Sequence, residues 1–167
     1  SDFPKQARTL PNVGSYTAFS LEQIVAAGPD LILMWGSGNG AGALEKLERL
    51  GFPVYVSELR ALADIPESIR RLGRLAGTQA HSEQQAQRLE AGFAALQAQY
   101  GDAEVLSVFY QIWHEPLQTV SGEHLISQII TLCGGHNIFA DAPTLAPRVN
   151  LESVLARNPR AIVAGGM

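Results

Sequence analysis

The sequence contains a single cysteine, Cys133, among its 167 residues, which excludes a disulfide framework and a zinc site built from thiolates. Charge is also scarce, since 17% of the residues are charged, the net charge is -4 and no block of like charges occurs. The basic stripe typical of a nucleic-acid-binding protein is therefore missing. The longest apolar run, near residues 31–35, has the length of a buried strand and is too short to span a membrane.

The usual sequence signatures of catalysis are missing as well. There is no Gly-x-Ser-x-Gly elbow, and the pair His114-Glu115 is not part of a His-Glu-x-x-His helix. We therefore expect no enzyme, no catalytic residue, no cofactor and no metal site.

What the chain does contain is a regular alternation of helical and strand-like patterns. Strands are expected at residues 30–35, 53–57, 104–110 and 161–164, and helices at 20–27, 43–50, 65–76, 82–100, 122–133 and 150–156. This order predicts an α/β fold with parallel sheets and right-handed crossovers. The strand 30–35 is apolar throughout, as in a sheet covered on both faces.

The alternation is interrupted by one long polar helix. Ser82 is the expected N-cap and Gly101 the expected stop, and a narrow apolar stripe suits a helix that packs on one side and braces two lobes. We expect an N-terminal lobe over residues 1–79, a bridging helix over 80–101 and a C-terminal lobe over 102–167.

An internal repeat supports two similar lobes. Residues 20–33 (SLEQIVAAGPDLIL) match residues 150–163 (NLESVLARNPRAIV), and each copy is read as a cap, a helix, a proline turn and a strand. The repeat places Glu22 and Glu152 at equivalent positions in the first turns of equivalent helices. Either carboxylate alone is explained by the helix dipole, but a matched pair, one on each lobe, suits a partner with paired arginines.

The chain resembles the periplasmic binding proteins of the cobalamin and iron-siderophore ABC importers, and among them the members that carry cobalamin. The resemblance covers nearly the whole chain and is carried by residues 1–7 (SDFPKQA), 20–25 (SLEQIV), 29–32 (PDLI) with Trp35, 98–100 (AQY), 120–122 (VSG), 133–139 (CGGHNIF) and 154–157 (VLAR). It implies two Rossmann-like lobes joined by a rigid helix, in a protein that acts in the periplasm or is exported and lipid-anchored.

The resemblance also implies roles for individual residues. Glu22 and Glu152 fall where each lobe meets arginine pockets of the membrane permease. The ligand, cobalamin or a related corrinoid, would lie in the cleft between the lobes against the aromatic side chains of Tyr16, Trp35, Tyr110 and Trp113. Family members begin before Ser1 and continue past Met167, so we expect a chain truncated at both ends that self-associates or swaps segments.

Two alternatives stay open. A tryptophan expected near Ala146 is missing, and His114, His124 and His136 make haem or a ferric siderophore a second possible ligand class. The glycine-rich residues 38–43, followed by Glu58 near the end of the next strand, fit a loose dinucleotide-binding pattern. That pattern keeps a dinucleotide-binding enzyme as the less favoured alternative.

Overall fold

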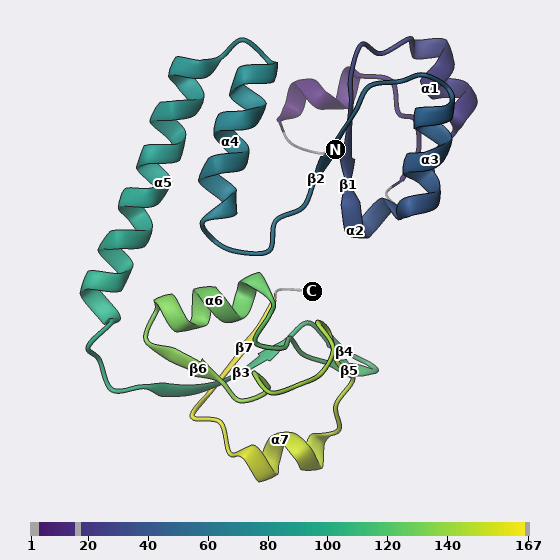
Figure 1. Ribbon diagram of the computed structural model, residues 1–167. Coiled ribbons are helices and arrows are strands. Elements are labelled where there is room, and N and C mark those ends of the chain that lie inside the picture. Colours follow the sequence, from purple (N-terminus) through teal and green to yellow (C-terminus); the bar gives the residue numbers. More distant parts are fainter. Residues whose placement is uncertain (1–3, 16–17, 166–167) are drawn as a thin grey trace. The chain divides into compact units, whose positions relative to one another are not determined.

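The computed structural model describes residues 4–15 and 18–165. The chain divides into two compact units, Ser1–Glu58 and Leu59–Met167, whose elements are labelled in Figure 1. Both units combine helices with parallel strands, which confirms the α/β fold class. Over the described residues, no helix has both the length and the apolar character needed to cross a bilayer.

The first unit is a two-stranded parallel sheet with helices packed on it. Its elements are η1 (Lys5–Thr9), α1 (Leu21–Ala27), β1 (Ile32–Trp35), α2 (Gly36–Asn39), α3 (Ala41–Arg49) and β2 (Val54–Ser57). Strands β1 and β2 pair in register from Ile32 with Val54 to Trp35 with Ser57. The core consists of Ile24 from α1, Met34 from β1 and Leu47 from α3.

One face of this sheet is exposed, so the expectation that strand 30–35 is covered on both faces is wrong. Met34 is 5% exposed and lies in the core, whereas Leu33 and Trp35 are 58% and 52% exposed. Side chains alternate between the two faces of a strand. Helices α1 and α3 therefore cover one face of β1, and Trp35 lies on the other.

The second unit contains a three-stranded sheet in the order β6-β3-β7, with all pairs parallel. Its elements are α4 (Asp64–Leu75), α5 (Gln79–Tyr100), β3 (Leu106–Gln111), β4 (Trp113–His114), β5 (Leu117–Gln118), α6 (Leu125–Leu132), β6 (Gly135–Asn137), α7 (Leu151–Arg157) and β7 (Ala161–Ala164). Strands β4 and β5 form a separate antiparallel hairpin.

Strand β3 is buried on both faces. Its neighbouring residues Val108 and Phe109 are 6% and 2% exposed and point to opposite sides of the sheet. On the Phe109 side, α7 contributes Val154 to a core that includes Phe139, whose ring meets Phe109 edge-on at 5.9 Å. Helix α6 covers the opposite face of the sheet in Figure 1.

Helices α4 and α5 pack closely because small residues meet where they cross. Gly73 of α4 lies against Ser82 of α5, and Ala86, one turn further along α5, is fully buried. Arg70 then joins the two helices, since its guanidinium donates to Glu83 at 2.9 and 3.1 Å and to Glu90 at 2.7 and 2.9 Å. These carboxylates raise the pKa of Arg70.

This crossing corrects the expected start of the long helix. Helix α5 begins at Gln79 with Thr78 as its N-cap, and Ser82 lies inside it with its hydroxyl donating to the Gln79 carbonyl. Gly101 is the C-cap, as expected. The boundary between the two compact units falls after Glu58, and α4, which packs along α5, belongs with it to the second unit. The division into lobes 1–79 and 102–167 with a bridging helix over 80–101 stays a prediction.

Candidate functional site

The two halves of the sequence repeat fold in the same way. In α1 the Ser20 side chain accepts a hydrogen bond from the Gln23 amide at 3.2 Å, and in α7 the Asn150 side chain accepts one from the Ser153 amide at 2.8 Å. Each helix ends on a left-handed residue, Gly28 (φ 55°) and its counterpart Asn158 (φ 44°). Each is then followed by a proline and a strand, so the repeat is a structural one.

Glu22 and Glu152 occupy the first turns of these helices, and both side chains are exposed. Because Ser20 and Asn150 already cap the backbone, the capping function does not need either carboxylate. Neither side chain has a hydrogen bond or ion pair with another of the described residues. Each unit therefore presents one solvated carboxylate on the same structural element.

Trp35 lies at the carboxyl end of β1, where the chain enters the glycine-rich turn. Residues Gly36–Asn39 form the short helix α2, and the Asn39 side chain accepts a hydrogen bond from the Trp35 amide at 2.8 Å. The indole is about half exposed on the open face of the sheet. It is the largest exposed apolar side chain of that face, where Leu33 is also exposed.

The same turn argues against the dinucleotide alternative. In a dinucleotide site the backbone amides of the glycine-rich turn must be available to a pyrophosphate. Here the Glu58 carboxylate accepts hydrogen bonds from the Ser37 amide at 2.6 Å and from the Ser37 hydroxyl at 3.0 Å. A carboxylate at this position repels phosphate, so the turn is not built as a phosphate cradle.

Tyr110 and Trp113 are three residues apart in the second unit, at the end of β3 and in the following hairpin. Trp113 is 47% exposed, and its indole nitrogen donates to the Glu115 carbonyl at 2.9 Å. The ring of Trp113 lies 5.5 Å from that of His114. Tyr110 is half-buried, and its carbonyl accepts from the Thr119 hydroxyl at 2.7 Å. Tyr16, the fourth expected aromatic, lies outside the described residues.

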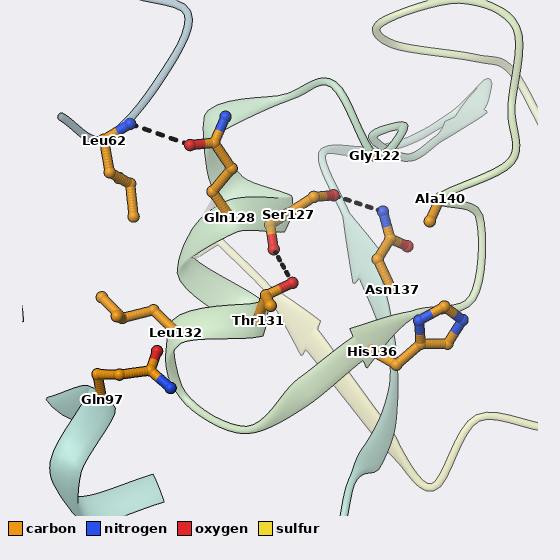
Figure 2. A pocket seen from close by; sticks show the side chains of 10 residues that line it. All are labelled: Leu62, Gln97, Gly122, Ser127, Gln128, Thr131, Leu132, His136, Asn137 and Ala140. Carbon is orange, nitrogen blue, oxygen red and sulfur yellow. Dashed lines mark hydrogen bonds between the residues drawn. The ribbon is translucent and has the colours of Figure 1, made fainter. Parts of the chain in front are cut away.

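A pocket that the sequence did not indicate lies beside α6 (Figure 2). It has a volume of about 410 Å³ and is lined by Leu62, Gln97, Gly122, Ser127, Gln128, Thr131, Leu132, His136, Asn137 and Ala140. Among the expected aromatic residues that the structure describes, neither Trp35 nor Tyr110 nor Trp113 lines it. Gly122, His136 and Asn137 of this lining lie in segments that carry the family resemblance, and His136 is also one of the three histidines that keep haem or a ferric siderophore open as the ligand.

The polar groups at the base of this pocket are satisfied by the protein itself. The Asn137 amide donates to the Val120 carbonyl at 2.8 Å and to the Ser127 hydroxyl at 2.6 Å, and that hydroxyl donates to the Ser121 carbonyl at 2.7 Å. Asn137 and Ser127 are both buried. A network with its donors and acceptors paired in this way stabilises the fold.

The histidines are not gathered into a metal centre. No group of three or more His, Cys, Asp and Glu side chains able to hold a metal ion occurs in the part of the chain that the structure describes. His124 has a structural position, because it is the N-cap of α6 and its Nδ1 accepts from the Ile126 amide at 3.1 Å. Burial lowers the pKa of His124 below its ordinary value, which favours the neutral, accepting form.

Comparison with curated proteins finds relatives that are named vitamin B12-binding proteins. The vitamin B12-binding protein of Vibrio parahaemolyticus is 36% identical over 162 residues, which are 97% of this chain and 59% of that protein. The vitamin B12-binding protein of Pectobacterium carotovorum is 39% identical in an alignment 175 positions long, which covers 99% of this chain and 61% of that protein. The chain thus spans about three fifths of the length of the curated relatives it matches.

Solved structures agree with the fold. The periplasmic vitamin B12 binding protein BtuF of Vibrio cholerae matches with a TM-score of 0.89 at 33% identity, over 98% of this chain and 64% of that one. The periplasmic heme binding protein HutB of Vibrio cholerae matches with a TM-score of 0.83 over 99% of this chain and 65% of that one, but at 21% identity it shows the fold alone. The model of the periplasmic binding protein family matches residues 1–167. The chain therefore belongs to the periplasmic binding protein family.

Proposed function

We propose that this chain captures cobalamin, or a related corrinoid, and delivers it to the membrane permease of an ABC importer. Two relatives that are 36% and 39% identical are named vitamin B12-binding proteins, and the BtuF structure carries the same description at 33% identity. The protein would act in the periplasm, or exported and lipid-anchored, as a carrier and not as an enzyme. It would need no cofactor of its own, because cobalamin is the cargo.

The observation that carries this proposal is the repeated unit with one exposed carboxylate in each compact unit. Glu22 and Glu152 would each pair with an arginine of the permease, one on each half of that partner. Bidentate arginine–carboxylate pairs are short and directional, so two of them fix both the position and the orientation of a docked protein. Their long-range attraction would also speed the encounter at low salt.

The exposed aromatic side chains would form the ligand surface. Trp35 is on the first unit and Trp113 on the second, and each keeps about half of its surface open to solvent. Flat indole rings offer a corrin a large contact area at little cost in side-chain entropy, and few charges are needed to hold such a ligand. Tyr110 and Tyr16 would extend these walls. In this account residues 1–79 and 102–167 are the two lobes and 80–101 the brace between them.

Docking is tested by removing the two carboxylates while leaving the ligand surface intact. Glu22→Ala with Glu152→Ala should abolish cobalamin uptake in cells that depend on this protein and leave the Kd for cyanocobalamin unchanged. The matched control is Glu48→Ala with Glu123→Ala, which also removes one exposed carboxylate from each unit. Unimpaired uptake in the first variant, or weakened ligand binding with normal uptake, would refute the assignment of the two glutamates.

Haem is the second candidate ligand, and one contact favours it. His114 is exposed beside the Trp113 ring, and histidine imidazole is a common ligand of haem iron. If haem is the cargo, haemin should give a shifted Soret band with this chain that His114→Ala abolishes. If the corrinoid is the cargo, His114→Ala should leave cyanocobalamin affinity unchanged.

A further inference from the structure

The glycine-rich turn after β1 contacts Trp35 twice. Asn39 binds the Trp35 amide, and Gly38 lies against the indole ring. A Cβ atom placed on Gly38 would lie 1.9 Å from Cε3 and 2.3 Å from Cδ2 of the Trp35 indole. Real carbon atoms cannot approach so closely, so the ring rests directly on the backbone of residue 38. The absence of a side chain at this position is what leaves room for the indole.

The turn that carries Gly38 is held in place from outside. Helix α2 has only four residues, which is too short to be stable alone. Its first turn is fixed by Glu58, whose carboxylate accepts from both the amide and the hydroxyl of Ser37. The approach is tight, because a Cβ on Gly36 would lie 2.8 Å from Glu58 Oε2 and 3.0 Å from Val56 Cγ1. Asn39 closes the turn by accepting from the Trp35 amide.

These contacts connect Glu58, which follows β2, to the indole of Trp35 through the residues of the turn. Glu58 holds Ser37, the turn holds Gly38 beneath the ring, and Asn39 fixes the backbone from which the ring projects. A tryptophan at a strand end without such support would sample several rotamers. Binding a flat ligand would then carry the entropy cost of selecting one of them.

We infer that the turn Gly36–Asn39, with Gly38 and Glu58 as its positioning residues, holds the Trp35 indole in one orientation. This gives the glycine-rich motif a role that needs no nucleotide. Its consequence for ligand affinity rests on the proposed function, in which Trp35 touches the cargo. Gly38 offers no side chain to the ligand, and still the affinity should depend on it.

The positioning itself is tested without any ligand. Trp113→Phe leaves Trp35 as the only tryptophan, so that emission and near-UV dichroism report on this ring alone. In that background Gly38→Ala should shift the emission maximum and raise acrylamide quenching of the fluorescence. The matched control is Gly42→Ala, a few residues further along, where an added Cβ meets no atom within 4 Å. It should leave both signals unchanged.

Glu58 supplies a second and milder perturbation in case Gly38→Ala folds poorly. Glu58→Ala should loosen the turn and move the Trp35 signals in the same direction. Glu58→Gln, which keeps an oxygen to accept from the Ser37 amide, should restore them. Trp35 signals that are the same in Gly38→Ala and Gly42→Ala, or in Glu58→Ala and the parent, would overturn the inference.

Affinity is measured with Trp113 in place. Gly38→Ala and Trp35→Ala should each weaken cyanocobalamin binding by about tenfold, as expected for a well-packed aromatic contact, and Gly42→Ala should not. If Gly38→Ala shifts the Trp35 signals but leaves the affinity for cyanocobalamin unchanged, the positioning role is supported. In that case Trp35 as a ligand contact is refuted. The two claims therefore fail separately.

Discussion

Replacement of Gly73 by alanine should force helices α4 and α5 apart. A Cβ on Gly73 would lie 1.8 Å from the hydroxyl oxygen and 2.3 Å from the Cβ of Ser82. Rotation of the hydroxyl relieves the first contact, but the second involves an atom fixed to the backbone of α5. The helices must move, and the hydrogen bonds from Arg70 to Glu83 and Glu90 would lengthen with them.

The size of the effect follows from two opposing contributions. In an unobstructed helix interior, alanine is favoured over glycine by about 1 kcal/mol. Overpacking a close contact costs about 1–3 kcal/mol. The net effect of Gly73→Ala is therefore a fall in the free energy of unfolding of up to about 2 kcal/mol, with a fall in Tm of about 2–4 °C for each kcal/mol in a chain of this size.

The control is a glycine within α5 that faces open space. A Cβ on Gly92 meets no atom within 4 Å, so Gly92→Ala should stabilise the protein by up to about 1 kcal/mol. Urea unfolding followed by circular dichroism at the helix band measures both. Ser82→Gly should partly rescue Gly73→Ala. Equal stabilisation by Gly73→Ala and Gly92→Ala would refute the close crossing.

Three further outcomes are expected. Phe109→Ala should lower the free energy of unfolding by about 3–5 kcal/mol, because it empties a buried site and removes the edge-on contact with Phe139; a loss below about 1 kcal/mol in a urea titration would contradict this packing. Asn150→Ala should cost about 1 kcal/mol through the lost cap of α7, and unchanged stability would argue against the cap. Burial lowers the pKa of His124 in the folded state, so at a given acidic pH the unfolded state binds more protons than the folded state. The free energy of unfolding should therefore fall as the pH drops below 6.5. His124→Asn, which can still cap α6, should flatten that dependence between about pH 7 and about pH 5, and a slope identical to the parent's would rule out the role of His124.

The repeat was the part of the fold most fully predictable from the sequence. Matched leucine, glutamate and proline positions identified two copies of one unit, and capping rules located Ser20 and Asn150 at the helix starts. The structure confirms both caps. Such local features are predictable because they depend on residues three or four positions apart.

Features that depend on distant residues were not predictable in the same way. Ser82 is a strong capping residue, and nothing in its own segment shows that a tight turn after α4 starts the helix three residues earlier. Strand β6 has only the residues Gly135, His136 and Asn137, without the apolar alternation that marks a strand. The contact between Ser37 and Glu58 joins positions 21 residues apart, so the sequence of the glycine-rich turn alone does not exclude a nucleotide site.

The candidate site was predictable mainly as a set of residue types. An aromatic such as Trp35 in a wholly apolar strand is equally consistent with a core residue, and only the exposed face of β1 distinguishes the two. The pocket beside α6 depends on residues from Leu62 to Ala140, which no local pattern connects. Burial and pocket formation are properties of packing, and packing is decided by tertiary neighbours.

Titration of the purified chain with cyanocobalamin, followed by desalting and an absorbance spectrum, tests the central claim most directly. One equivalent of cyanocobalamin should stay with the protein, Trp35→Ala should weaken its binding by about tenfold, and Glu22→Ala with Glu152→Ala should leave it unchanged. Elution of all the cyanocobalamin in the small-molecule fraction, with haemin retained by the same protein, would contradict a corrinoid carrier and identify a haem carrier in its place.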